Sequence, residues 1–294
     1  MEVNLSYEPY AEDPEYISTN REFFDTLDLE HVHLVLDLAC GTGLISQLLL
    51  QRNSALAIRG VDISQESLDI GRRSFRERGV HVESETAWAA AARAGSGVIF
   101  LEESPADDLQ FENHMFDLAV MGNAIHLMPD KGSFLRGVHR VLKPGGTFAF
   151  NSVFFVGTFA DDTESFFLEW MKQALAVLGE INARREAKGE GPIPRRRGKG
   201  GRAFDKNWMT VEQWRDIVSD SGFKVTQARK RLTSISRKGL ELVGAYGGLA
   251  EVLMSGYPVD TASECLQEAA GRTFDKLCKT EIGRYWLEVT AVKV

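Results

Sequence analysis

Residues 33–43 read HLVLDLACGTG, and this stretch decides the fold. Its first half is an apolar run with branched side chains, which is typical of a buried β-strand. The run breaks at Gly41-Thr42-Gly43, and residues 44–51 then have the pattern of a helix. A strand, a glycine turn and a helix in this order predict the first unit of a doubly wound α/β sheet. Such a sheet binds its ligand at the carboxyl ends of its strands.

Further apolar runs follow along the chain at residues 57–62, 98–101, 116–121 and 147–150. Amphipathic stretches separate several of them, and Ser64 is placed to cap the helix that follows the second run. Strands that alternate with helices predict a parallel sheet with crossover helices. We therefore expect an α/β fold.

The sequence pattern changes beyond residue 151. Residues 161–188 have apolar positions at helical spacing, and Thr210 with Gln213 forms a capping-box pattern. We divide the chain into an N-terminal lid segment (1–30), a core (31–155), a helical insertion with a basic loop (156–210), a core helix and strand (211–236), a second helical insertion (237–282) and a terminal strand (283–294).

The composition limits the classes of partner. The 294 residues include 34 Lys plus Arg and 42 Asp plus Glu, a formal net charge of −8, which disfavours a broad surface for DNA or anionic membranes. No apolar run approaches the roughly 18 residues of a membrane helix, and the first residues are acidic, so we expect a cytoplasmic protein. The three cysteines lack zinc-site spacing, and we expect no metal.

An acidic residue, Asp62, ends the second strand, 19 residues after Gly43. This spacing suits a carboxylate that accepts hydrogen bonds from the ribose hydroxyls of a nucleoside. A dinucleotide fingerprint would place a third glycine at position 46, where this chain has Ser46. An NADP site would want an arginine near Asp62, but Arg59 lies at an odd offset on the strand and is expected to point elsewhere.

Four ordered stretches resemble the motifs of class I S-adenosylmethionine-dependent methyltransferases. They are residues 36–43 (LDLACGTG), 60–64 (GVDIS), 116–126 (FDLAVMGNAIH) and 140–146 (RVLKPGG). The resemblance implies a Rossmann-like, seven-stranded, mostly parallel sheet, with a helical cap formed by the C-terminal insertions. It also implies S-adenosyl-L-methionine as cofactor and methyl transfer as activity.

The same resemblance assigns roles to individual residues. The methionine end of the cofactor would be lined by residues of the glycine turn and its strand: Asp37, Ala39, Gly41, Thr42 and Gly43. Asn123 would face the methionine part through its backbone carbonyl or its side chain. Tyr16, with Tyr7 and Tyr10, belongs to a segment that folds over the cofactor in many members of the family.

The resemblance places the nucleoside on the second strand and on the loop after the third. Asp62 would hold the ribose, and Ile63 would pack on adenine. The adenine-binding loop would include Pro105 and Ala106, with proline where the family usually has an acid. S-adenosylmethionine carries a sulfonium cation and no phosphate, which agrees with the first two motif stretches, since they supply Asp37 and Asp62 and lack Lys and Arg.

His126 is the candidate catalytic residue. Methyl transfer is an in-line displacement that depends mainly on alignment and exclusion of water, so a general base matters only if the acceptor loses a proton. His126 follows Asn123 by three residues, just beyond the fourth strand. The alternative is that His126 packs under a loop and binds the backbone.

The function that we expect is methyl transfer to a small-molecule acceptor in a capped pocket, in secondary metabolism, with anionic and aromatic acceptors both open. The basic run Arg195–Arg202 supports an alternative, in which a protein, a carrier-tethered substrate or RNA docks there. A noncatalytic nucleoside-binding module is a second alternative. The oligomeric state is left open.

Overall fold

The computed structural model describes residues 13–161, 163–196 and 208–294. The chain forms two compact units. We call residues 17–158, 208–231 and 286–294 the sheet unit, and the described residues of 1–16, 159–207 and 232–285 the helical unit. Strands β6 and β7 each contribute residues to both.

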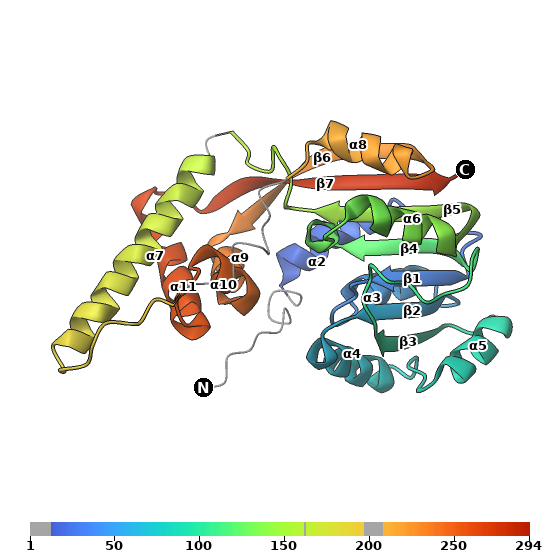
Figure 1. The fold of residues 1–294 in the computed structure, drawn as a ribbon, viewed down its shortest axis with the longest axis horizontal. Helices are drawn as coiled ribbons and strands as arrows, with labels where there is room; N and C mark the ends of the chain where they lie inside the picture. Colours follow the sequence, from blue (N-terminus) through green and yellow to red (C-terminus); the bar gives the residue numbers. More distant parts are fainter. Residues whose placement is uncertain (1–12, 162, 197–207) are drawn as a thin grey trace. The chain divides into compact units, whose positions relative to one another are not determined.

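A seven-stranded sheet lies at the centre of the sheet unit, and its strands β6 and β7 continue beyond that unit (Figure 1). Its strands lie in the order β3-β2-β1-β4-β5-β7-β6. The pairs from β3 to β5 are parallel, whereas β7 runs antiparallel to β5. This confirms the predicted α/β class and its mostly parallel sheet. The strands are β1 (Leu34–Leu38), β2 (Ala57–Asp62), β3 (Val98–Glu103), β4 (Phe116–Gly122), β5 (Leu142–Ser152), β6 (Phe223–Ser236) and β7 (Glu281–Lys293).

Several helices of the sheet unit begin where the sequence has capping residues. Ser64 accepts a hydrogen bond from the backbone N–H of Ser67, and Thr210 forms the predicted capping box with Gln213. The elements are α2 (Pro14–Phe24, which begins in the helical unit), α3 (Leu44–Arg52), α4 (Gln65–Glu77), α5 (Glu85–Arg93), the short 3₁₀ helix η1 (Ile125–Leu127), α6 (Lys131–Val141) and α8 (Val211–Asp220). The sequence pattern does not predict α5, in which Trp88 is the one buried residue.

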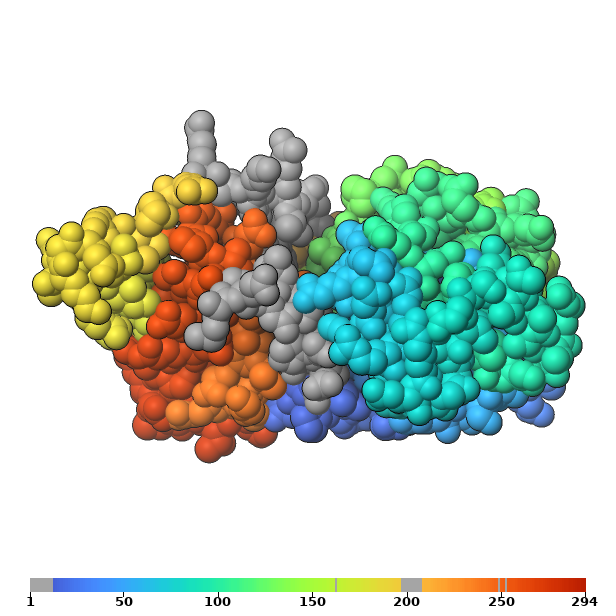
Figure 2. Space-filling view, turned by 90° about the horizontal axis from the view of Figure 1, so that it is seen from below, coloured from blue at the N-terminus to red at the C-terminus, as the bar shows by residue number. Residues whose placement is uncertain are grey.

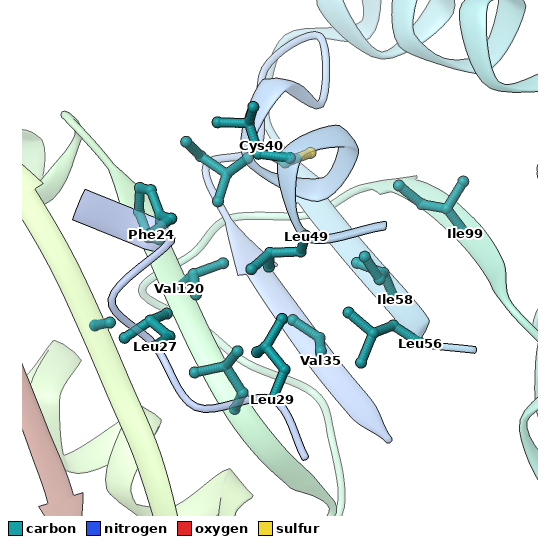
Figure 3. Close-up of a cluster of buried hydrophobic side chains, with 14 of the residues drawn as sticks. Phe24, Leu27, Leu29, Val35, Cys40, Leu49, Leu56, Ile58, Ile99 and Val120 are labelled. Atoms are coloured by element: carbon teal, nitrogen blue, oxygen red, sulfur yellow. The ribbon is translucent and has the colours of Figure 1, made fainter. Parts of the chain in front are cut away.

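A hydrophobic core fills the space beside β1 (Figure 3). Val35 of β1, Ile58 of β2 and Val120 of β4 are fully buried and pack with Leu49 of α3. Phe24, at the end of α2, belongs to the same cluster. The N-terminal segment from residue 17 is therefore part of the packed sheet unit.

The outer strands carry a buried carboxylate. Glu288 of β7 is fully buried, and its oxygens accept hydrogen bonds from Arg229 at 2.9 Å and Arg231 at 2.5 Å, both on β6. Arg231 also donates to the backbone carbonyl of Thr19 in α2 at 2.7 Å. A buried charge needs such partners, so Glu288 makes the pairing of β6 with β7 specific.

The helical unit has a core of its own, around Phe166, Trp170 and Phe274. The indole N–H of Trp170 donates to the carbonyl of Leu266 at 2.9 Å. The unit contains α7 (Thr163–Glu186), α9 (Arg237–Ala245), α10 (Gly247–Leu253) and α11 (Val259–Lys276). In Figure 2 the atoms of α7 are drawn in yellow to yellow-green. In the part of the chain that the structure describes, no helix has the length and apolar character needed to cross a membrane.

Candidate functional site

The carboxyl ends of the central strands meet at one edge of the sheet. Asp37 of β1 pairs in register with Gly60 of β2 and Val120 of β4, and Gly122 of β4 pairs with Asn151 of β5. The loops that follow these four strands carry most of the site residues that the sequence predicted. Parallel strands bring such loops together, as the fold class requires.

The turn after β1 depends on left-handed backbone conformations. Ala39, Gly41 and Gly43 have φ values of 51°, 54° and 88°. A Cβ atom on Gly41 would meet no atom of the described part of the chain within 4 Å, so these residues leave the backbone open to a ligand there. A Cβ atom on Gly43 would lie 2.5 Å from the ring of Phe75, so packing of α4 also requires this glycine.

Asp62 joins the glycine turn to the turn after β2. One carboxylate oxygen, Oδ2, accepts from the backbone N–H of Gly41 at 2.8 Å, and the other, Oδ1, accepts from Ser64 N–H at 2.8 Å. Each carboxylate oxygen can accept more than one hydrogen bond. The two backbone donors therefore fix the direction of a carboxylate that can still accept from ligand hydroxyls.

Asp37 lies on β1, the strand that leads into the glycine turn, and its carboxylate is fully buried. Its Oδ2 accepts from the hydroxyl of Ser46 at 2.6 Å and from the Ser46 backbone N–H at 3.1 Å. Its Oδ1 is buried and has no hydrogen-bond partner among the described residues. Burial raises the pKa of Asp37 from 3.8 to about 7, against the opposing effect of the Ser46 hydrogen bonds. This arrangement fits a ligand that brings a hydrogen-bond donor or a positive charge.

Ser46 was missed as a functional residue by sequence reasoning. It stands where a dinucleotide fingerprint has its third glycine, and its hydroxyl instead serves the buried Asp37. The combination of an acid within the strand and a serine nine residues later is the signal that could have found it.

The predicted adenine side has one strongly exposed apolar residue. Ile63, directly after β2, is 74% exposed, which is unusual for an isoleucine. In the loop after β3, Ala106 is buried and Pro105 is exposed. The backbone N–H of Ser104 donates to the carbonyl of Asp62 at 3.0 Å, so this loop is tied to the end of β2.

Arg59 is engaged away from the candidate site, as predicted. Its guanidinium, nearly fully buried, forms ion pairs with Glu85 of α5 at 2.9 Å and Glu102 of β3 at 2.5 Å. It also lies over the ring of Trp88, 5.2 Å from the centroid. Arg59 therefore anchors α5 to the sheet and does not serve as a phosphate ligand beside Asp62.

The loop after β4 is held by an asparagine on β5. Asn123 has a φ of 50°, and its backbone N–H donates to Asn151, to Oδ1 at 2.9 Å and to the carbonyl oxygen at 3.1 Å. The side-chain oxygen of Asn123 accepts from Val153 N–H at 3.0 Å. The amide of Asn151 in turn donates to Oδ1 of Asn20 in α2 at 2.9 Å.

His126 lies on η1 and is half-buried. Its Nδ1 lies 3.4 Å from the hydroxyl of Ser152 at the end of β5. Its ring is 4.0 Å, centroid to centroid, from that of Phe154, at an angle of 37°, and Phe154 meets Trp208 edge-on at 5.9 Å. His126 is thus brought to the same edge as Asn123 and forms part of an aromatic group.

Other predicted residues lie elsewhere or outside the described residues. Tyr16 belongs to the helical unit, is 5% exposed, and donates its backbone N–H to Asp13. Tyr7 and Tyr10 lie outside the described residues, as does most of the basic run, from residue 197 onward. Within the ranges that the structure describes, no cluster of three or more His, Cys, Asp or Glu residues could hold a metal.

The core of the chain matches a known protein family. The methyltransferase domain family matches residues 36–150. The ubiquinone/menaquinone biosynthesis C-methyltransferase UbiE of Geotalea daltonii is 29% identical over 113 residues, 38% of this chain and 42% of that protein. Methyltransferase GfsG of Streptomyces halstedii is 27% identical over 157 residues, 53% of this chain and 50% of that one. The chain thus spans half the length of these curated relatives or less.

A solved structure extends the likeness in fold to most of the chain. The YcgJ protein from Bacillus subtilis superposes with a TM-score of 0.53 at 17% identity, covering 94% of this chain and 98% of that one. At this identity the likeness concerns the fold alone. The ordered motifs, the sheet topology and the matched domain agree with one another, and residues 36–150 of the chain match the methyltransferase domain family.

Proposed function

We propose that the chain transfers a methyl group from S-adenosyl-L-methionine to a small-molecule acceptor. The proposal rests on two acids at the glycine turn: Asp37 on the strand that precedes the turn, and Asp62, which accepts a hydrogen bond from it. Asp37 is buried and one of its oxygens has no hydrogen-bond partner among the residues that the structure describes, whereas Asp62 is fixed by Gly41 and Ser64. When bound, the cofactor supplies an electrophilic methyl group on a sulfonium, and its positive charges suit a site built from carboxylates and backbone.

Each site residue has a distinct task in the proposed complex. Asp37 would stabilise the ammonium of the methionine part, directly or through water, and Gly41 would let the backbone approach it. Asp62 would accept from the ribose hydroxyls, and the exposed Ile63 would pack on the adenine. Ala39, Thr42, Gly43, Pro105 and Ala106 would complete the pocket wall, as the family resemblance implies.

The acceptor would lie over the loops after β4 and β5. The rings of His126 and Phe154 lie against each other there in a tilted arrangement, and Trp208 extends this aromatic group, so a flat or apolar acceptor suits the surface. Where the acceptor is acidic at the reacting atom, His126 would take its proton, with Ser152 orienting the imidazole. The names of UbiE and GfsG, both methyltransferases, agree with this proposal.

The test is transfer of label. The protein would be incubated with methyl-labelled S-adenosylmethionine and separate fractions of metabolites, protein and RNA, and the products analysed by mass spectrometry. Label in a small molecule supports the proposal, and label in protein or RNA would replace it with a polymer substrate. Binding of S-adenosylhomocysteine in calorimetry without transfer to any fraction would favour a noncatalytic nucleoside-binding module.

A further inference from the structure

A chain of three asparagines runs from the N-terminal helix to the loop after β4. Asn20 of α2 and Asn151 of β5 are both fully buried, although asparagine is usually exposed. They are 131 residues apart in sequence and are joined by a hydrogen bond of 2.9 Å between the Asn151 amide and the Asn20 oxygen. Buried amides are costly unless paired, so this contact fixes the orientation of the Asn151 side chain.

The orientation of Asn151 decides what its oxygen can do. Because its NH₂ group faces Asn20, its Oδ1 faces the backbone N–H of Asn123 at 2.9 Å. Asn123 has a left-handed φ of 50°, a conformation that a non-glycine residue adopts at some cost. The hydrogen bond from Asn123 to Asn151 offsets that cost and holds the turn in place.

The same turn controls which group of Asn123 can face a ligand. Its side-chain oxygen already accepts from the Val153 N–H at 3.0 Å. Family resemblance leaves open whether the backbone carbonyl or the side chain of Asn123 faces the methionine part of the cofactor. The bond to Val153 favours the carbonyl, whose direction is set by the backbone that Asn151 holds.

We propose that Asn20 and Asn151 are positioning residues that aim the Asn123 backbone carbonyl at the amino-acid end of the cofactor. The inference rests on the proposed function, since it concerns the same cofactor. It adds a role for α2, which supports the methionine subsite from within the sheet unit. Loss of this support should weaken the binding of ligands that possess the amino-acid end. The affinity of ligands that lack this end should stay unchanged.

Two probes separate these ligands. S-adenosylhomocysteine carries the amino-acid end, whereas 5′-methylthioadenosine keeps only the nucleoside and its sulfur. In calorimetry, Asn20→Leu should weaken binding of S-adenosylhomocysteine by about tenfold and change that of 5′-methylthioadenosine by less than about twofold. Asn20→Asp keeps an oxygen that accepts from Asn151 and should restore most of the lost affinity.

A matched control distinguishes positioning from general loosening of α2. Phe24 is fully buried one turn further along the helix, and Phe24→Leu disturbs packing without touching the asparagines. Equal losses for both probes, or the same selective loss in Phe24→Leu, would overturn the proposal. Should Asn20→Leu fail to fold, Asn151→Ala removes the side-chain oxygen that accepts from the Asn123 backbone N–H and should show the same selectivity.

Failure of the proposed function itself has a separate signature. A wild-type protein that binds neither probe would remove the cofactor assignment. Amide hydrogen exchange then still tests the positioning, because Asn20→Leu should speed exchange at the Asn123 and Val153 amides, while Phe24→Leu should not. Unchanged exchange at both amides would refute the coupling of α2 to this loop.

Discussion

Cofactor binding should release a proton from Asp37. Burial places its pKa at about 7, and a nearby ammonium favours the ionised carboxylate. If the cofactor binds only the ionised form, the observed Kd equals the Kd of that form multiplied by (1 + 10^(pKa − pH)). Binding of S-adenosylhomocysteine should therefore be about thirtyfold weaker at pH 5.5 than at pH 8.5, a difference of about 2 kcal/mol.

Calorimetry in two buffers of different ionisation enthalpy measures the protons released as well as the affinity. Asp37→Asn removes the titrating group and should make both quantities nearly independent of pH. 5′-Methylthioadenosine, which lacks the ammonium, should show a much smaller dependence in the wild type. An equal slope for both ligands, or no proton release near pH 6, would refute the placement of Asp37 beside the ammonium.

Three further substitutions test other parts of the sheet unit. Asp62→Ala should weaken cofactor binding by about 1–3 kcal/mol, because it removes a charged acceptor; unchanged affinity in calorimetry would take Asp62 out of the site. Once an acceptor is identified, His126→Ala should slow labelled transfer and leave cofactor affinity within about twofold, and an unaltered rate would return His126 to a packing role. Gly43→Ala should lower the free energy of unfolding by about 1–3 kcal/mol, since its Cβ would lie 2.5 Å from Phe75 at a φ of 88°; urea denaturation measures this, and an unchanged midpoint would contradict it.

The parts of the fold that are encoded locally could be predicted. The strand-turn-helix of residues 33–51 and the caps at Ser64 and Thr210 depend on residues a few positions apart. The offset of Arg59 from Asp62 on one strand correctly placed its guanidinium elsewhere, because side chains alternate along a strand. The boundaries of the predicted segments, the lid and the cap stay predictions.

The contacts between distant segments could not be predicted in this way. Nothing near Asn20 in sequence indicates that its side chain meets Asn151, and both residues would be expected at the surface. The stack of His126 on Phe154 likewise depends on the parallel register of β4 and β5, which no single segment encodes. A pattern in sequence reports the face that a residue occupies, whereas the partner on that face is decided by the tertiary fold.

The position of β7 between β5 and β6 has a consequence for synthesis of the protein. During translation β5 emerges more than a hundred residues before β7, yet β7 is the strand that covers its edge. A nascent chain that ends before residue 281 exposes that edge and leaves Arg229 and Arg231 without Glu288. Exposed strand edges promote aggregation, so we expect the sheet to be completed only after β7 has emerged from the ribosome, and chains that end before β7 to aggregate more readily.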